Sequence, residues 1–482
     1  MGPLEYVLIA ICIVLAVLLL TIIIRALLFV PPKKKEIKPA AVSVNTEKAA
    51  HDLAEMIKCK TVSDYDKSNE DEEEFKRFEA LLPELFPNVY KKCELEKVGD
   101  RGLLFRWRGK SSDAPTVLMS HYDVVSVDED AWEKPAFSGI IENGVLWGRG
   151  ALDTKGTLNG VLQAAEQLIC EGFVPRNDIY FAFGGDEEIN GHGATDIVEL
   201  FKSRGIEPGM VLDEGGAVVT NVVPGVSAPT ALIGIAEKGM ANIEYTVRGG
   251  GGHASSPKTV TPIGRLSRAC VRMEKHPLKY NMTAPAAKFF DTICRYSSFP
   301  YRVIFANLWC FGPALDLVAR LSGGELNAMV RTTTAFTQMQ GSKGANVIPP
   351  HASMVSNHRI ADGETVESLR ERIVKTIKDD KIEVSVLHGV NPSRISTTDC
   401  EGWERLCEAT AESWQDAVVS PYYMLACSDS RNWGVISDKV YRFSAMALSK
   451  EERGTIHGNN ERIPLSTISK TVEFYVRLMS KS

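Results

Sequence analysis

Three short apolar segments, each followed at once by polar residues, constrain the fold most strongly. Residues 116–119, 179–183 and 210–212 have the length and composition of buried strands, and helical stretches lie between them. This alternation is typical of an α/β sheet with helices on both faces. In open α/β sheets, ligands bind beyond the carboxyl ends of the strands. The side chains that follow these segments are therefore expected to converge.

Those side chains are ones that bind metal ions. His121 and Asp123 follow the first segment, Glu187 and Glu188 the second, and Asp213 the third. Imidazole nitrogens and carboxylate oxygens are ligands of catalytic zinc. Each piece alone has a plainer explanation, because an acid after a strand is usually a turn or a helix cap and a Glu pair is usually a solvated surface. Only the joint pattern favours a metal site.

Two later segments complete the candidate site. Asp153 precedes a helix within residues 148–155, and His457 lies within residues 454–459. A short carboxylate on a fixed loop suits a bridge between two ions, each of which then takes one imidazole and one further carboxylate. The adjacent Glu187 and Glu188 can divide the roles of ligand and general base. Asp123 shares a face with His121 if the strand continues, and can hold the second N–H of the imidazole.

The pattern changes after residue 238. Residues 241–247 alternate as in a half-exposed antiparallel strand, strand-like stretches recur at 352–360 and 382–387, and a helix is expected from about 366 to 378. We predict a smaller α+β domain at 239–389, inserted in a larger domain formed by 47–238 and 390–482.

The N-terminus predicts a membrane anchor at 1–30, followed by a linker at 31–46. Residues 6–24 carry no charge and are long enough to cross a bilayer. A basic start and a small-residue cleavage site are both missing, which favours a retained helix over a signal peptide. Arg25 and the lysines at 33–35 favour the cytoplasmic side for the body. Asn281-Met282-Thr283 can be glycosylated only if the body is luminal, so the side is left open.

Composition excludes other classes. The formal net charge of −6 gives no basic face for nucleic acid. The ten cysteines form no C-x-x-C pair, which argues against a thiolate zinc site and a dense disulfide framework. No G-x-S-x-G elbow supports a serine hydrolase.

Three motifs resemble a known family. They occupy residues 118–125 (Leu-Met-Ser-His-Tyr-Asp-Val-Val), 132–139 (Trp-Glu-Lys-Pro-Ala-Phe-Ser-Gly) and 346–350 (Asn-Val-Ile-Pro-Pro). From about residue 48 to 480 the chain resembles the zinc aminoacylases and carboxypeptidases, and most of all the branch with carboxypeptidase S and the N-fatty-acyl-amino-acid synthase/hydrolases. The resemblance implies a zinc-peptidase sheet domain with an inserted lid and dimerisation domain.

The resemblance also implies a ligand set. His121, Asp153 and Asp213 would bind one zinc ion, and Asp153, Glu188 and His457 would bind the other. Two Zn²⁺ per chain are expected, for which Co²⁺ or Mn²⁺ can substitute.

Further roles follow from the same resemblance. Glu187 would be the general base and Asp123 would orient the metal-binding histidine. His253 matches a lid histidine that polarises the scissile carbonyl, often across a dimer interface; a capped loop histidine is the plainer reading. Asn346 and Arg359 match lid positions that contact substrate. For Arg359 a surface salt bridge is nearly as good an explanation, although a guanidinium fits a substrate carboxylate well.

The expected activity is hydrolysis of the amide bond of N-acyl amino acids or of C-terminal residues of small peptides, in a chain that can form a homodimer through its lid. The runner-up is a dipeptidase or carboxypeptidase of the same family. A non-catalytic binding protein on this fold and a serine or cysteine hydrolase are the alternatives from other classes.

Overall fold

A mixed eight-stranded sheet forms the centre of the larger part of the molecule. The computed structural model describes residues 2–33 and 38–482. The strand order is β1-β2-β6-β3-β7-β16-β8-β15, and the four pairings β3–β6, β3–β7, β7–β16 and β8–β15 are parallel. The strands are β1 Glu94–Val98, β2 Gly102–Trp107, β3 Ser111–His121, β6 Asn177–Gly184, β7 Met210–Val219, β8 Thr230–Glu237, β15 Val418–Met424 and β16 Val440–Ala447.

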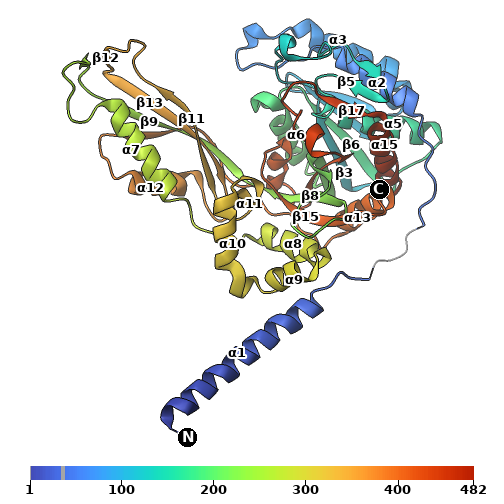
Figure 1. Cartoon of the computed structure of the whole chain (residues 1–482). Coiled ribbons are helices and arrows are strands. Elements are labelled where there is room, and N and C mark those ends of the chain that lie inside the picture. The colour runs from blue at the N-terminus through green and yellow to red at the C-terminus, as the bar shows by residue number, and fades with distance from the viewer. Residues whose placement is uncertain (1, 34–37) are drawn as a thin grey trace.

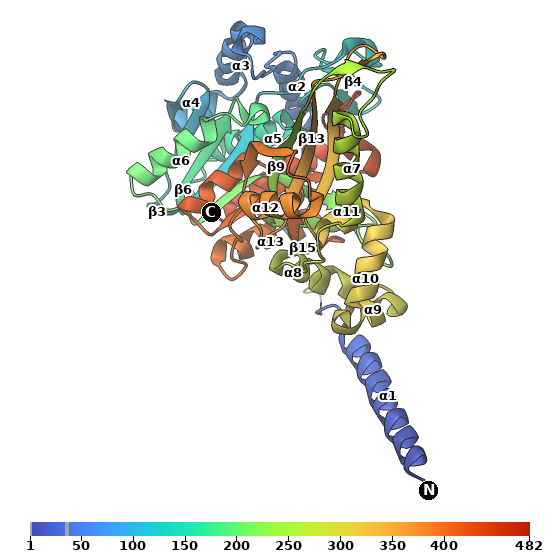
Figure 2. The same cartoon turned by 90° about the vertical axis from the view of Figure 1, so that its left-hand side faces the viewer.

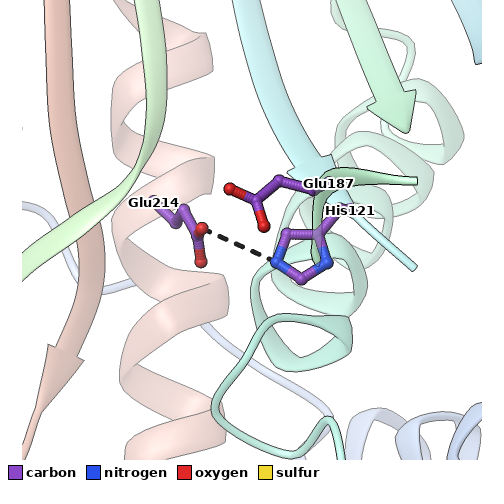
Figure 3. Close-up of side chains that lie close together, drawn as sticks. All are labelled: His121, Glu187 and Glu214. Carbon is purple, nitrogen blue, oxygen red and sulfur yellow. Dashed lines mark ion pairs between the residues drawn. The ribbon is translucent and has the colours of Figure 1, made fainter. Parts of the chain in front are cut away.

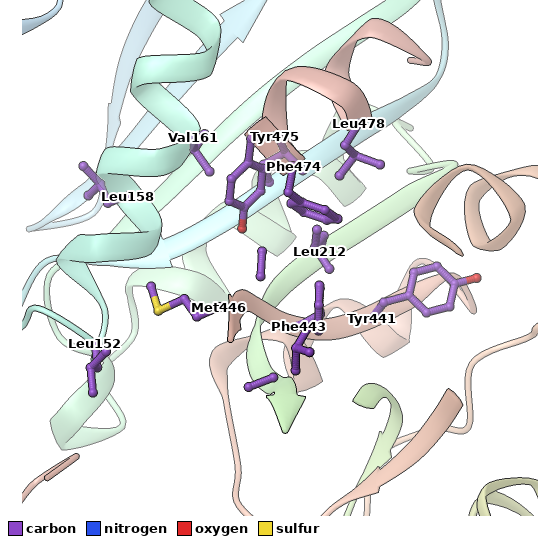
Figure 4. Packing of buried hydrophobic residues seen from close by; sticks show 14 of the residues in the cluster. Leu152, Leu158, Val161, Leu212, Tyr441, Phe443, Met446, Phe474, Tyr475 and Leu478 are labelled. Carbon is purple, nitrogen blue, oxygen red and sulfur yellow. The ribbon is translucent and has the colours of Figure 1, made fainter. Parts of the chain in front are cut away.

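Helices cover both faces of this sheet. Successive strand residues point to opposite sides, and both sides carry apolar side chains that the helices bury. Val117 and Val211 pack with Trp433 on the face covered by α6 (Gly193–Ser203) and the 3-10 helix η5 (Asp429–Val435). Leu118 and Leu212 belong to the large core on the other face. Figure 4 shows Leu212 beneath the aromatic side chains of the C-terminal helix. That face is covered by α2 (Thr46–Ile57), α5 (Lys155–Cys170), α13 (Glu401–Ser413) and α15 (Leu465–Ser480). The expected α/β class with helices on both faces is confirmed.

A second, antiparallel sheet projects from the first (Figure 1). Its order is β11-β13-β9-β14, and its apolar side packs against two helices. The expected strands at 241–247 and 352–360 lie in this sheet, and the helix expected at 366–378 packs against it. The elements are β9 Gly239–Arg248, α7 Pro262–Lys275, β11 Thr333–Gln340, β13 His351–Ile360, α12 Val366–Ile377 and β14 Glu383–Val390, with the small pair β10 Gly252–His253 and β12 Val347–Ile348 at one end.

Four helices inside the predicted range 239–389 lie on the side of the larger sheet, and the first of them packs directly on it (Figure 1). Phe289 and Ile293 share its core, and the helix that carries them contacts β15. The four are α8 Ala284–Ile293, α9 Phe299–Phe305, α10 Leu308–Ser322 and α11 Gly324–Met329.

The first helix, α1 (Pro3–Leu28), extends away from the folded body beside α9 and α10 (Figures 1 and 2). Its mean hydropathy of 3.6 over an 18-residue window and its length suit a membrane span, although a signal sequence would have the same properties. Only its last turns are packed: Ile22 and Ala26 are its buried residues. Within the predicted linker 31–46, residues 34–37 lie outside the described residues.

A three-stranded sheet of order β17-β5-β4 joins the C-terminal segment to the loop before α5. Its strands are β4 Ile140–Glu142, β5 Val145–Trp147 and β17 Arg462–Pro464. The remaining helices are α3 Glu72–Leu85, α4 Pro87–Lys92 and α14 Lys450–Arg453, with 3-10 turns η1 Lys67–Asn69, η2 Glu129–Ala131, η3 Glu187–Ile189 and η4 Cys294–Tyr296.

Candidate metal centre

Strand β3 places His121 between the two strands that carry its neighbours. β3 pairs with β6 on one side and β7 on the other, and His121, its last residue, pairs with Gly184, the last residue of β6. The chain then turns into η3, which starts with Glu187 and Glu188. Both acids are thus held beside the histidine, at the carboxyl ends of parallel strands.

His121 makes contacts through both ring nitrogens. Nδ1 lies 3.0 Å from the backbone oxygen of Asp123 and 3.3 Å from its Oδ1. Nε2 lies 3.0 Å from Asp153 Oδ1 and 3.6 Å from Glu214 Oε1. With the Nδ1 proton donated to Asp123, the lone pair of Nε2 is directed at the carboxylates, which is the arrangement of a metal-binding histidine.

His457 approaches the same aspartate from the opposite side. Its Nε2 lies 3.1 Å from Asp153 Oδ2 and 3.0 Å from Glu188 Oε2. The two oxygens of Asp153 therefore face two different imidazoles, Oδ1 toward His121 and Oδ2 toward His457. A carboxylate in this position can bridge two cations.

Two groups of donor atoms, each within 4.8 Å of one another, occur among the described residues. One is His121, Glu187 and Glu214, and the other is His121, Asp153 and Glu188. Figure 3 shows the first group, with the ion pair between His121 and Glu214. Nitrogen and carboxylate oxygen donors in this number suit open, catalytic zinc sites.

Asp213 lies in neither group, although it lines one small pocket with His121 and Glu187, and its expected role as a ligand stays a prediction. Its Oδ2 accepts a hydrogen bond of 2.9 Å from the backbone N–H of Ser430. Its neighbour Glu214 is the residue of β7 whose carboxylate lies 3.6 Å from His121 Nε2. Sequence analysis assigned no role to Glu214.

Burial shifts the acids of the centre toward their neutral forms. It raises the pKa of Glu187 well above its ordinary value and that of Glu214 to about 8. Burial also raises the pKa of Glu188, although its hydrogen bond to His457 acts in the opposite direction. Burial likewise acts to raise the pKa of Asp153, but its hydrogen bonds to the two imidazoles lower it below the usual range.

The imidazoles shift in the opposite sense. Burial acts to lower the pKa of His121, but Glu214 and the hydrogen-bonded aspartates outweigh burial and raise it. Hydrogen bonds to Asp153 and Glu188 raise the pKa of His457 to about 10. Four carboxyl groups thus lie beside two imidazoles, and ionising all four would leave an excess of negative charge that two protonated imidazoles do not balance. This donor set fits a pair of divalent cations.

Asp123 fixes the group from behind and is fully buried. Its Oδ2 accepts a hydrogen bond of 2.7 Å from Ser63 Oγ and one of 3.1 Å from the N–H of Glu188. Its Oδ1 accepts from the N–H of Glu187 at 3.2 Å and faces His121. The predicted orienting residue therefore contacts the histidine and both glutamates.

Glu461 holds the loop of Asp153 and was missed in the sequence. Its carboxylate accepts hydrogen bonds from Arg149 Nη1 (2.7 Å) and from the backbone N–H groups of Gly150 (3.1 Å), Leu152 (2.7 Å) and Asp153 (3.1 Å). Glu461 is fully buried, and Arg149 is 2% exposed. The two residues stand 312 positions apart, and only the pairing of β5 with β17 brings them together.

The structure separates the three predicted lid residues. The second, antiparallel sheet and its two helices correspond to the predicted lid. His253 and Asn346 lie together at its far end, where the N–H of Ala254 donates to Asn346 O at 2.9 Å. His253 is exposed, and its Nδ1 lies 2.7 Å from Ser255 Oγ. Arg359 lies at the other end of β13, where its Nη1 is 3.5 Å from Cys427 Sγ. Within one chain, only Arg359 is on the side of the metal centre.

A network of buried ion pairs and hydrogen bonds connects Glu237, at the end of β8, to Asp213 on β7. Glu237 accepts hydrogen bonds from Ser428 and Ser430 and pairs with Arg442 and Arg431. Residues 428–431 resemble a loop near the site in related enzymes, with a role that the sequence leaves open. In the structure they link Glu237 to Asp213, which accepts a hydrogen bond from Ser430.

An α/β sheet with imidazoles and carboxylates gathered at its strand ends defines a metallohydrolase. The model of "Peptidase family M20/M25/M40" matches residues 117–481. The chain belongs to this peptidase family and is an amidohydrolase, as the motifs led us to expect.

Relatives with assigned activities support this family assignment. An N-fatty-acyl-amino acid synthase/hydrolase of Xenopus tropicalis is 36% identical over 437 residues, which cover 89% of this chain and 85% of that protein. A probable carboxypeptidase S-like protein of Dictyostelium discoideum is 34% identical over 441 residues, covering 90% and 85%. Among solved structures, an M20 family metallo-carboxypeptidase from Sulfolobus solfataricus has a TM-score of 0.66 at 16% identity, over 90% of this chain and 98% of that one. That likeness shows the shared fold.

Proposed function

We propose that the chain is a di-zinc hydrolase that cleaves the amide bond of N-acyl amino acids. One observation carries the proposal: Asp153 faces His121 with one oxygen and His457 with the other, and each histidine has a further carboxylate beside it. This is the donor arrangement that a bridged pair of ions requires.

The geometry supports one change to the predicted ligand set. His121, Asp153 and Glu214 would hold the first ion, with Glu214 in the place first given to Asp213. Asp153, Glu188 and His457 would hold the second. Bound zinc ions supply Lewis acidity, which makes a water molecule more acidic and polarises the scissile carbonyl.

Glu187 is the proposed general base. It lies within the same group of donor atoms as His121, and it needs no metal to hold it because Asp123 accepts a hydrogen bond from its N–H. Burial, which favours the neutral carboxylic acid, makes Glu187 a strong proton acceptor for water and a proton donor to the leaving amine. Asp123 keeps both glutamates and the histidine in position throughout.

Substrate recognition is assigned to the free carboxylate of the amino acid. Arg359 is the proposed partner, because its guanidinium lies against the loop of Cys427, one residue before the segment that reaches behind the metal centre. A guanidinium binds a carboxylate through two parallel hydrogen bonds. The acyl part is proposed from the frog relative, which is named for N-fatty-acyl amino acids; the carboxypeptidase S-like relative makes small peptides the second candidate.

The test replaces Glu187 with Gln. We expect kcat for N-acyl amino acids to fall by about 10²–10⁴, because the proton acceptor is lost. Metal content, measured by mass spectrometry, should stay near two ions per chain. Glu199→Gln on exposed α6 is the matched control and should keep full activity. Retained activity in the Glu187 variant would remove this residue from the role of base.

The same assay separates the other classes of protein. A serine or cysteine hydrolase would keep its activity after treatment with a chelator, whereas the proposed enzyme loses it and regains it with Zn²⁺, Co²⁺ or Mn²⁺. A non-catalytic binding protein would hydrolyse none of the N-acyl amino acids or dipeptides. Against that alternative, the full set of donors and the positioned Glu187 are retained.

We further propose that the chain acts as a homodimer through its lid. His253 and Asn346 lie at the end of the lid sheet opposite Arg359, and the eight residue steps of β13 from His351 to Arg359 span about 26 Å. They can therefore serve a centre only in a second copy. Mixing inactive His253→Ala and Glu187→Gln chains should restore part of the activity, because half of the mixed dimers' sites regain both side chains. No recovery in a confirmed mixed dimer would refute the role of His253.

Retention of α1 as a single membrane span is also proposed. Asn307, fully buried, donates to the backbone oxygen of Ile22 at 3.1 Å, and Arg25 Nε donates to Ala306 O at 3.1 Å. Removal of the helix would leave the buried amide of Asn307 without this partner. The basic residues after the span favour a cytoplasmic body, which protease protection of vesicles would test.

A further inference from the structure

One strongly apolar cavity of the described chain lies outside the metal centre. It has a volume of about 320 Å³ and lies between the end of β7, the start of β8 and the helices α8–α11. Phe289, Phe290, Leu315 and Met329 are among the side chains that line it. None of the proposed metal ligands contacts this space, and no step of the proposed mechanism uses it.

The mouth of the cavity opens on an apolar surface. Three of the residues that line it, Tyr301, Ile304 and Val318, are 40%, 36% and 53% exposed. Around them, α9 and α10 expose further large apolar side chains, including Trp309 (57%) and Leu321 (79%). Contiguous apolar surface of this kind marks a contact with another apolar phase.

That surface adjoins the proposed membrane span. The corner between α9 and α10, a bend of 102°, holds Asn307, whose amide binds the end of α1. Figures 1 and 2 both place the C-terminal end of α1 next to α9. A body fixed in this way to a membrane-spanning helix presents the α9–α10 corner to the bilayer surface. Trp309 and Tyr301 are residue types enriched at that depth.

Two residues that line the cavity are close along the chain to residues of the metal centre. Val219 lines the cavity and follows Glu214 by five residues on the same strand, a separation of at most about 17 Å. Arg453 also lines it, and precedes His457 by four residues. Two opposed lipid layers make a hydrocarbon core of about 30 Å, so a single membrane-lipid chain is about 15 Å long. Such a chain matches the separation.

We propose that this cavity binds the hydrocarbon chain of the acylated substrate, which enters from the bilayer between α9 and α10 while the amide reaches the metal centre. The proposal deepens the proposed function and rests on it. It commits to a single unbranched acyl chain as occupant, because the apolar lining offers few partners for a polar ligand, and its mouth opens beside a membrane span. Each methylene group buried in the cavity raises the affinity by about fourfold.

The experiment compares N-acetyl and N-palmitoyl amino acids on the full chain in phosphatidylcholine vesicles. Ala314 lines the mouth and is exposed, so Ala314→Trp fills the entrance without disturbing the core. We expect kcat/KM for the palmitoyl substrate to fall at least tenfold and that for the acetyl substrate to change less than twofold. Leu317→Trp is the control, because Leu317 is exposed on the same helix and does not line the cavity.

A second measurement does not depend on catalysis. A photoreactive palmitate analogue should label peptides of α8 and α10 saturably, and Ala314→Trp should abolish this labelling. Equal losses for both substrates, equal effects of the two Trp variants, or labelling that does not saturate would each overturn the proposal. If the unaltered chain hydrolyses neither substrate and the labelling still saturates, the proposed acyl-amino-acid activity is wrong while the cavity keeps its hydrocarbon ligand.

Discussion

The carboxylate of Glu461 offers the sharpest test of how the centre is held together. It binds no proposed metal ion, yet it accepts four hydrogen bonds from the segment that ends at Asp153. Replacing it with Ala would leave Arg149 charged, 2% exposed and without the carboxylate that it pairs with among the described residues. Breaking a buried pair in this way costs about 3–5 kcal/mol, and three backbone N–H groups lose their acceptor as well.

Glu461→Gln is the milder and more informative change. The amide oxygen can take the place of Oε1, which accepts from Leu152 and Asp153, but the NH2 group then meets Arg149 and the N–H of Gly150. Two of four acceptor contacts become donor against donor. At about 1–3 kcal/mol for each unsatisfied buried donor, we expect a loss of about 3 kcal/mol in the free energy of unfolding.

The consequence for the metal centre is separate from the loss of stability. Because the same hydrogen bonds fix the loop that carries Asp153, we expect metal affinity to fall by about 10–100-fold, as for other changes to groups that orient ligands. Urea unfolding gives the first quantity, and zinc titration against a fluorescent chelator gives the second. Glu451→Gln is the control: it makes the same chemical change in an exposed pair with Arg462, for which about 0–1 kcal/mol is expected.

The reasoning would be refuted if Glu461→Gln behaved like Glu451→Gln in both assays. A loss of stability with unchanged metal affinity would show that Glu461 supports the fold without positioning Asp153. Adding Arg149→Met to Glu461→Gln should restore part of the stability, since it removes the unpaired charge, but should leave the metal affinity low.

Two further predictions address the ligand set and the lid. Glu214→Gln should lower the metal content toward one ion per chain, whereas Asp213→Asn should keep two; the reverse result, read by mass spectrometry, would restore Asp213 as the ligand. In the lid, burial lowers the pKa of His358 to about 4. Between pH 6.5 and 4 the unfolded chain therefore binds a proton that the folded chain does not, and stability falls with pH by up to about 1.4 kcal/mol per unit, about 3 kcal/mol in all. His358→Gln should flatten this slope in urea unfolding measured from pH 7 to pH 4, and an unchanged slope would contradict the assignment.

The strand-end rule predicted much of the centre from the sequence. It selected His121 and the pair Glu187 and Glu188, because a polar residue directly after a buried parallel strand has only one edge of the sheet to occupy. It did not distinguish Asp213 from Glu214, since both follow the same apolar segment. By alternation Asp213 shares the face of Val211, as His121 shares that of Val117, so the observed approach of Glu214 to the histidine has no signal in the strand pattern.

Other features depend on contacts that have no local signal. The apolar residues of α8 suit either an inserted lid or the large sheet, and only the observed packing of Phe289 and Ile293 distinguishes them. The pairing of Arg149 with Glu461 depends on the register of β5 with β17. A buried acid that accepts hydrogen bonds from the backbone looks in the sequence like any surface acid, so burial has to be known before its role can be inferred.

The pattern of hydrogen bonds explains how so many acids can be buried side by side. Three of the proposed ligands, His121, Glu188 and Asp153, lie in segments that are held by an acid that is not itself a ligand. Asp123 holds His121 and the N–H groups of η3, and Glu461 holds the loop of Asp153. Backbone N–H groups and Arg149 stabilise these two holding acids, so their negative charge is already balanced. The ligand carboxylates have only the two imidazoles as partners, and burial correspondingly raises the pKa of Glu214. The hydrogen-bond donors of the protein thus position the ligands, and the charge of the ligand carboxylates is left for cations to balance. Metal binding and the order of this site should therefore be coupled.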